Sequence, residues 1–307
     1  MSRLIQFVVL ISVSVMLPLA NADEYDLYFL GGQSNMEGFG TVAELPDELQ
    51  GQLDGVMIFH SAPMTDQTAA SGDGIWSVFR PGHGTGFVFN DGKNIYSDRF
   101  GLEVSMAHAL HAASPNRKIA IIKYARNGSS IAIGAAGPWG CWDPDFQATD
   151  GEFRGVNQYD HFLATMRRAM ADQDIDDDGV ADQLIPKGIA WMQGESDAAS
   201  DLQTAENYQA NLKRLMDLIR ATMHVDDVPV VIGRISDSGN HPSGKVWKHG
   251  ERVRTAQQDF VDQDSSAAIV TSTDDYAYSD PWHYDSKGYI DLGRRFAEAF
   301  KSLAEPK

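Results

Sequence analysis

Residues 25–38 read YDLYFLGGQSNMEG, and this stretch decides the fold. The largely apolar run Tyr25–Leu30 has the length and composition of a strand that is buried in a parallel sheet. Two glycines follow it directly and allow a tight turn at the end of the strand. Ligands of open α/β sheets bind beyond the carboxyl ends of the strands. We therefore expect the loop around Ser34 to lie at a ligand-binding edge of the sheet.

Further short apolar runs alternate with helical patterns along the chain. The other predicted strands are Lys118–Tyr124, Gly188–Met192, Val228–Ile235 and Ala267–Thr273. Between them apolar residues recur at helical spacing, as in Tyr208, Leu212, Leu215, Met216 and Ile219. Strands that alternate with helices predict an α/β fold, a three-layer α/β/α sandwich with a central parallel sheet of about five strands. The segment Thr41–Arg99 has little periodicity, which predicts functional loops over one face.

The first 22 residues have the pattern of a secretory signal peptide. Arg3 precedes an apolar run over residues 4–19, and the small-x-small sequence Ala-Asn-Ala ends at residue 22. A membrane anchor fits less well, because the run is short and Pro18 interrupts its end. We expect a single domain over residues 23–307, in the periplasm of a bacterium or outside the cell.

The net charge and the cysteine content limit which binding partners and which cellular compartment fit this chain. The formal charge of −18 disfavours nucleic acid and anionic lipid, because both need basic patches. Cys141 is the only cysteine, so no internal disulfide can form, which fits export into a bacterial envelope. After residue 22 no stretch is apolar enough to span a bilayer. A neutral or weakly charged substrate suits such a chain best.

Ser34 needs a base to become a nucleophile, and of nine histidines only His283 has a suitable setting. It lies between the last predicted strand and the last predicted helix, at the same edge as Ser34. Asp280 is three residues upstream and can reach Nδ1 of His283 in a turn shaped by Pro281. That bond would fix the tautomer and leave Nε2 free to take the Ser34 proton. The alternative is a glycine loop that cradles phosphate, but no dinucleotide or P-loop fingerprint is present.

Together with WMQGESD at residues 191–197, these motifs carry a family resemblance. The blocks GQSNM at 32–36, QGExD at 193–197 and DxxH at 280–283 stand in the family's order. The chain resembles the sialate O-acetylesterase and acetylxylan esterase group, carbohydrate esterase family 6 of the SGNH-hydrolase superfamily. The resemblance implies a flavodoxin-like, SGNH-hydrolase fold. It also implies a secreted serine esterase, a carboxylic ester hydrolase, that removes O-acetyl groups from carbohydrates such as sialic acid or xylan-type glycans.

The resemblance also implies roles for single residues. Ser34 matches the nucleophile, His283 the base and Asp280 the residue that orients the base. The oxyanion hole would combine the N–H groups of Ser34 and Gly128 with the side-chain amide of Gln193. The residues expected to orient these groups without contacting the substrate are Asn35, Glu195 and Asp197. The residues expected to contact substrate are Asn127, Trp139 and Trp142, although the two tryptophans could equally pack within their loop.

Two rival functions remain open at this point. One is a different activity on the same fold, such as lipid or thioester hydrolysis, which a preference for long acyl chains would reveal. The other is a carbohydrate-binding protein without catalysis, which the intact set of Ser34, Asp280 and His283 disfavours. The esterase chemistry itself needs no metal or organic cofactor.

An acidic stretch over residues 174–182 resembles a calcium-binding loop. The matching positions are Asp174, Asp176, Asp178, Gly179, Val180 and Asp182, at positions 1, 3, 5, 6, 7 and 9 of an EF-hand loop. Position 12 is Ile185, so the usual bidentate glutamate is missing. We expect a structural Ca²⁺ here, and the alternative is a solvated acidic turn between a helix and a strand.

Overall fold

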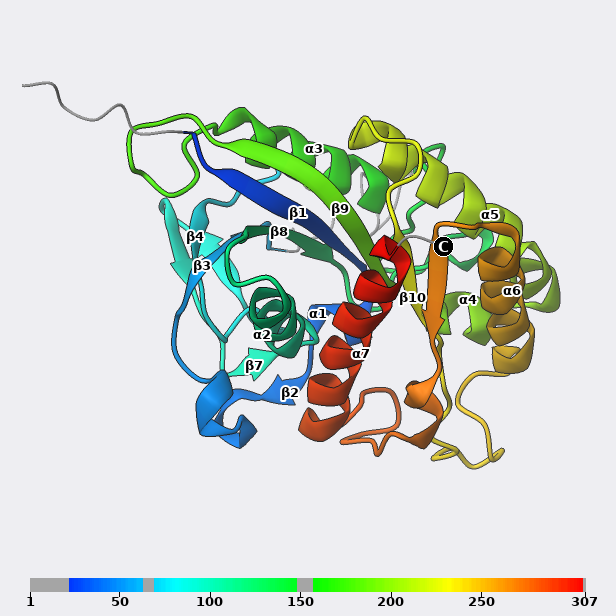
Figure 1. Cartoon of the computed structure of the whole chain (residues 1–307). Helices are drawn as coiled ribbons and strands as arrows, with labels where there is room; N and C mark the ends of the chain where they lie inside the picture. The colour runs from blue at the N-terminus through cyan, green and yellow to red at the C-terminus, as the bar shows by residue number, and fades with distance from the viewer. Residues whose placement is uncertain (1–21, 63–68, 148–156, 306–307) are drawn as a thin grey trace, which may run out of the picture.

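The computed structural model describes residues 22–62, 69–147 and 157–305, so the predicted signal peptide lies almost entirely outside the described residues. Its centre is a seven-stranded sheet in the order β11-β10-β9-β1-β8-β3-β4 (Figure 1). The strands are β1 (Glu24–Gly32), β3 (Leu53–His60), β4 (Trp76–Phe79), β8 (Lys118–Ala125), β9 (Gln183–Met192), β10 (Val230–Gly233) and β11 (Ala267–Val270). All neighbours pair parallel except β3 and β4, which are antiparallel.

Helices cover both faces of this sheet. They are α1 (Ser34–Glu37), α2 (Glu103–Ala113), α3 (Gln158–Ala171), α4 (Glu195–Ala199), α5 (Leu202–Thr222), α6 (Gly250–Gln263) and α7 (Ser286–Ala304). Consecutive residues of β1 point to opposite faces, so Tyr28 packs on Phe300 of α7 while Phe29 packs on Phe162 of α3. Helices α2 and α7 thus share one face, and α3, α5 and α6 lie on the other (Figure 1). The predicted α/β/α sandwich is confirmed.

The segment Thr41–Arg99 differs from the prediction of loops alone, because it contains two strands of the central sheet. Strand β3 pairs with β8 through its apolar end, and β4 then pairs with β3 at the edge. Two short antiparallel pairs also lie here: β2 (Gly40–Thr41) pairs with β7 (Arg99–Phe100) across the whole segment, and β5 (Val88–Asn90) forms a hairpin with β6 (Lys93–Ile95). The apolar run of β3 covers residues 56–59 and stands in a segment rich in Gly, Pro, Asp and Ser with no helical pattern beside it, so the sequence does not mark it as a strand.

Local sequence explains where the long helices begin and how closely they pack. Asn157, Asp201 and Asp285 each accept backbone N–H bonds from the first turn of α3, α5 and α7. In α7, a Cβ at Gly293 would lie only 2.1 Å from the backbone oxygen of Leu102, so glycine lets α7 approach the start of α2. None of the helices among the described residues is long and apolar enough to cross a membrane.

A buried ion pair fixes the helix that begins at Ser34 against the sheet. Lys123 of β8 and Glu103 of α2 are both fully buried, and their charged atoms lie 2.9 Å apart. The same ammonium group donates to the backbone oxygens of Glu37 (2.9 Å) and His83 (2.8 Å). All three donor hydrogens of the ammonium are therefore used, and the end of α1 is fixed against β8.

Replacing Lys123 tests this arrangement. Lys123→Met leaves the buried Glu103 carboxylate without its positive partner, with only the Gly101 N–H still bonded to it, and we expect the free energy of unfolding to fall by about 3–5 kcal/mol. The matched control is Lys213→Met, which breaks an exposed pair with Asp217 and should cost less than about 1 kcal/mol. Urea unfolding measures both values, and equal losses in the two variants would contradict the buried role of Lys123.

Candidate active site

Ser34 is the first residue of the short helix α1, directly after β1. The preceding residue is fixed by its N–H bond to the backbone oxygen of Met192 at the end of β9 (2.9 Å). Within the described part of the chain, no group accepts a hydrogen bond from the hydroxyl or the backbone N–H of Ser34. Both groups are therefore available to a bound molecule at the carboxyl edge of the sheet.

His283 and Asp280 form a closely bonded pair. The Nδ1 atom of His283 lies 2.7 Å from Oδ2 of Asp280, and the other carboxylate oxygen accepts the N–H groups of Trp282 and His283. Burial opposes ionisation of Asp280, but these bonds together hold its pKa below the usual value. The imidazole also stacks on Phe39, with ring centroids 3.6 Å apart. Its orientation is thus set by two independent contacts.

The loops that carry the serine and the histidine touch each other. Nδ2 of Asn35 donates to the backbone oxygen of Trp282 at 3.2 Å, so the residue after Ser34 contacts the residue before His283. A second link is the bond from Thr41 N–H to the hydroxyl of Ser286 (2.9 Å). Within the described residues no hydrogen bond joins Ser34 Oγ to His283 Nε2. Catalytic hydrogen bonds often tighten only when the substrate binds.

The loop after β8 brings a second backbone donor toward Ser34. The carboxylate of Glu37 accepts the N–H of Asn127 at 2.8 Å, which fixes this loop against α1. Gly128 follows with a φ of 72°, and a Cβ there would lie 2.0 Å from Trp139, so only glycine fits. The N–H of Gly128 donates to no group in the described ranges. It is therefore a free donor in a fixed loop.

Gln193 has a different place from the one expected. Its side chain is fully buried, and its amide nitrogen lies near three acceptors: Asp197 Oδ2 (2.7 Å), Gln33 Oε1 (3.2 Å) and the backbone oxygen of Ser129 (3.2 Å). An amide nitrogen has two hydrogens, so these contacts occupy both. In this arrangement the Gln193 amide joins the loops after β1, β8 and β9, and its hydrogens are used within the protein.

Two buried carboxylates support the site. Asp197 accepts the backbone N–H groups of Ile131 and Ala132 as well as the Gln193 amide. Glu195 accepts from Nδ2 of Asn35 at 2.8 Å. Burial of Glu195 raises its pKa to about 7, because the charged form has lost water and the Asn35 bond offsets only part of that cost.

The aromatic residues divide into buried and accessible ones. Trp142 is fully buried and packs edge-to-face on Trp191, so the prediction that it stacks on a sugar was wrong. Trp139 is 38% exposed beside Gly128. Trp282 is 49% exposed beside His283, and sequence reasoning missed it although it stands inside the DxxH block. The accessible pair, Trp139 and Trp282, thus lies next to Gly128 and His283.

The acidic loop lies at the opposite edge of the sheet, because it directly precedes β9. Carboxylate oxygens of Asp174, Asp176 and Asp178 lie within 4.8 Å of one another. Asp182 groups instead with Asp176 and Asp23, so the predicted ligands form two overlapping sets. Residue 180 contributes its N–H to Asp178 (2.8 Å).

Comparison with known proteins gives the family. A family model described as carbohydrate esterase, sialic acid-specific acetylesterase, matches residues 24–302. The chain belongs to this family. It is accordingly a carboxylic ester hydrolase, and esterases of this family need no catalytic cofactor. A probable carbohydrate esterase of Arabidopsis thaliana is 28% identical over 116 residues, which span 38% of this chain and 40% of that protein.

Solved structures of similar proteins agree in fold. An X-ray structure of an Arabidopsis thaliana protein has a TM-score of 0.60 at 18% identity and covers 92% of this chain and 99% of that one. A carbohydrate acetylesterase from Xanthomonas citri has a TM-score of 0.58 at 19% identity, covering 91% of this chain and 56% of that one. The structure of NanS gives 0.57 at 17% identity, covering 93% and 99%. At these identities the similarity shows the fold alone.

The raised pKa of Glu195 predicts a pH-dependent stability. Because the pKa rises from 4.5 to about 7 on folding, neutral Glu195 favours the fold fully below pH 4.5, and this contribution is lost as the pH rises through 7. The Glu195→Gln variant stays neutral at every pH and serves as the reference. We expect the stability of the parent relative to this variant, measured as the difference of their free energies of unfolding, to fall by up to about 3 kcal/mol from pH 4 to 8. Urea unfolding across this range measures it, and a constant difference would refute the assignment.

Proposed function

We propose that this protein is a secreted serine esterase that removes O-acetyl groups from carbohydrates through an acetyl-serine intermediate. The observation that carries the proposal is the Asp280–His283 pair, held against the loop that presents the free hydroxyl of Ser34. The family supports an acetylated carbohydrate as the substrate. Sialic acid and xylan-type glycans are the candidate sugars.

The chemistry follows from the positions of these groups. His283 Nε2 takes the proton of Ser34 Oγ as the oxygen attacks the acetyl carbonyl carbon. The negative oxygen of the tetrahedral intermediate accepts hydrogen bonds from the free N–H groups of Ser34 and Gly128. The imidazolium then gives its proton to the departing sugar oxygen. Water, activated by the same imidazole, hydrolyses the acetyl-serine, while Asp280 holds Nδ1–H throughout.

Gln193 has a positioning role in this proposal in place of an oxyanion contact. Its amide links Asp197, Ser129 and Gln33, and so keeps the loops that bear Gly128 and Ser34 at a fixed separation. On the substrate side we assign the accessible ring of Trp139 to the sugar, because it lies directly over Gly128. Asn127, half-buried in the same loop, is the neighbouring polar contact.

We also propose that residues 1–22 are removed on export, as the charged, apolar and small-x-small order of this segment indicates. The acidic loop supports a structural Ca²⁺ held by Asp174, Asp176 and Asp178, with the carbonyl of Val180 and Asp182 completing the shell. These oxygen donors suit a hard cation. Asp182 Oδ1 is buried without a partner among the described residues, and burial beside neighbouring acids raises the pKa of this carboxyl.

Esterase assays test the main proposal. Ser34→Ala should lose labelling by a fluorophosphonate and essentially all release of acetate, and Asp280→Asn should slow turnover by about 10⁴-fold through the wrong histidine tautomer. Asp275→Asn, an exposed acid nearby, serves as the matched control and should keep parental rates. The substrates are acetylated xylan, O-acetylated sialic acid and 4-nitrophenyl esters of two to eight carbons. Preference for long acyl chains, or labelling that survives in Ser34→Ala, would contradict the proposal.

The calcium proposal predicts a stabilising effect of the ion. Added Ca²⁺ should raise Tm in a concentration-dependent way, because a ligand that binds only the folded state stabilises it. Asp178→Asn should abolish the rise, since it removes one negative charge from the loop while keeping its shape. Differential scanning calorimetry with and without a chelator gives the comparison. An equal Ca²⁺ response in both proteins would exclude this loop as the site.

Export predicts a defined mature N-terminus. In a bacterial host the purified protein should begin at Asp23 and be found in the periplasm or the medium. Intact mass spectrometry measures the loss of residues 1–22. A protein that keeps Met1 in the cell envelope would favour an anchor over a signal peptide.

A further inference from the structure

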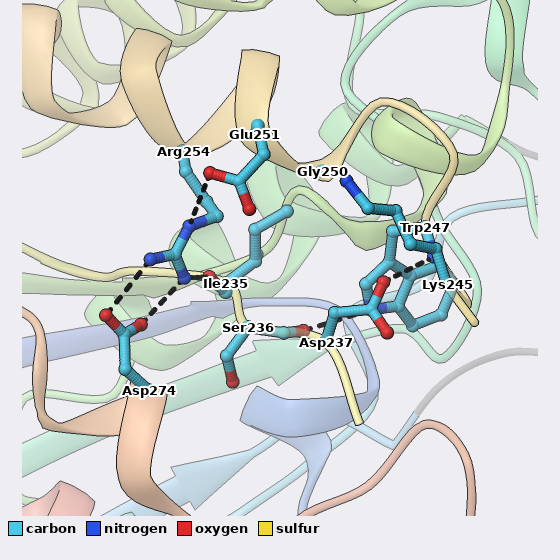
Figure 2. A pocket seen from close by; sticks show the side chains of 9 residues that line it. All are labelled: Ile235, Ser236, Asp237, Lys245, Trp247, Gly250, Glu251, Arg254 and Asp274. Atoms are coloured by element: carbon cyan, nitrogen blue, oxygen red, sulfur yellow. Dashed lines mark hydrogen bonds and ion pairs between the residues drawn. The ribbon is translucent and has the colours of Figure 1, made fainter. Parts of the chain in front are cut away.

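A pocket of about 260 Å³ opens beyond the carboxyl end of β10, separate from the groups used in the reaction. Its lining residues include Ser236, Asp237, Lys245, Trp247, Glu251 and Arg254 (Figure 2). Figure 2 shows Arg254 on one side of the pocket, Trp247 and Lys245 on the other, and Ser236 and Asp237 between them. An aromatic ring and charges of both signs therefore surround one concave space.

The floor of this pocket also supports the catalytic turn. The hydroxyl of Ser236 bonds with the hydroxyl groups of Tyr278 (2.7 Å) and Tyr284 (3.1 Å), and Ser238 Oγ donates to the backbone oxygen of Pro281 (2.8 Å). Pro281 is two residues from His283. The segment 236–238 thus connects the pocket to the turn that holds the base, which places the two as neighbours along one edge of the sheet.

Internal bonds fix the walls of the pocket. Asp237 accepts the backbone N–H groups of Gly239, Val246 and Trp247, and Nε1 of the Trp247 ring donates to the backbone oxygen of Ser236 (3.1 Å). On the other side, Arg254 makes two bonds to Asp274 (2.7 and 3.0 Å). A pocket with walls held in this way is formed before any ligand arrives, which lowers the entropy cost of binding.

The side chains of the pocket that are not fixed by strong internal bonds are suited to bind a sugar. Lys245 is exposed, and no ion pair or hydrogen bond holds its ammonium group within the described residues. The carboxylate of Glu251 is 79% exposed and lies 3.6 Å from Arg254, a weak pairing. Sugar hydroxyls both donate and accept hydrogen bonds, so one ring can use the ammonium and the carboxylate together. Trp247 supplies a flat apolar surface with a fixed orientation.

The positions of the accessible tryptophans also support a carbohydrate site. Of its six, Trp76, Trp142 and Trp191 are buried in the core. The other three are at least partly accessible, and each follows a different strand of the sheet: Trp139 after β8, Trp247 after β10 and Trp282 after β11. All three therefore lie along the edge of the sheet that carries Ser34 and His283.

We propose that this pocket is a second saccharide-binding subsite, which takes a sugar unit next to the one that carries the acetyl ester. The inference rests on the proposed function and extends it, because it makes the preferred substrate a glycan chain. The acetylated unit lies by Ser34 and Trp139, the chain passes Trp282, and the adjoining unit packs on the ring of Trp247. Lys245 and Glu251 bind its hydroxyl groups.

Binding to a chain that cannot turn over tests the subsite directly. Isothermal titration calorimetry uses the Ser34→Ala protein with two unacetylated probes, xylotetraose as a neutral chain and 3′-sialyllactose as an acidic one. We expect one of them to bind, and addition of Trp247→Ala to weaken that binding about tenfold. Trp247→Phe keeps the ring and should restore most of the affinity, which separates the loss of stacking from collapse of the loop. Lys245→Ala should also weaken binding, whereas Lys248→Ala, three residues away and outside the lining, should not.

Kinetics then connect the subsite to the reaction. Trp247→Ala should lower kcat/KM for acetylated xylotetraose or acetylated sialyllactose at least about tenfold more than for 4-nitrophenyl acetate, which has no second sugar. Binding of neither probe, or equal affinity with and without the Trp247 ring, would overturn the subsite. Because the calorimetry needs no turnover, that result is independent of the esterase assays. Hydrolysis that survives Ser34→Ala would overturn the mechanism and leave the binding result intact.

Discussion

The candidate active site depends on one buried amide, the side chain of Asn35. Asn35 donates from Nδ2 to Glu195 and to the backbone of Trp282, and its oxygen accepts the hydroxyl of Tyr289. These bonds join the ends of β1 and β9 to the turn and helix that follow β11. Ser34 and His283 are distant in sequence, and each adjoins a residue of this contact. A buried amide is costly unless all its groups are satisfied, so the arrangement that satisfies it is strongly preferred.

Burial has a second effect on the same region. Glu195, Asp197 and Gln193 are removed from water, and their bonds hold three loops in place before any substrate arrives. Backbone donors that are fixed beforehand need no reorganisation when negative charge develops on the substrate. The cost is visible in the raised pKa of Glu195. Burial of this carboxyl group thus lowers the stability of the fold while it keeps the site preformed. The buried Lys123–Glu103 pair fixes the end of α1 next to this site.

The sequence predicted the strands that alternate with helical patterns, and it missed the two sheet strands, β3 and β4, in the segment without such patterns. Strands β1, β8, β9, β10 and β11 have local patterns that need no partner to be seen. The apolar run of β3 is as long as that of β11, but it stands in a segment rich in Gly, Pro, Asp and Ser, and its pairing with β8 brings together residues far apart in the chain. The same limit applies to the site, where Trp139 and Trp142 look alike in sequence although one is 38% exposed and the other fully buried.

By itself, the sequence determined the order of the elements, the family blocks and the pairing of Asp280 with His283, because these depend on local periodicity or on a three-residue turn. Only the tertiary structure decided which donors are free. It assigned the Gln193 amide to neighbouring loops, left the N–H groups of Ser34 and Gly128 available, and placed Trp247 in the pocket beyond the end of β10. The physical reason is that hydrogen-bond satisfaction and burial are set by residues far apart in the chain, which no local pattern contains.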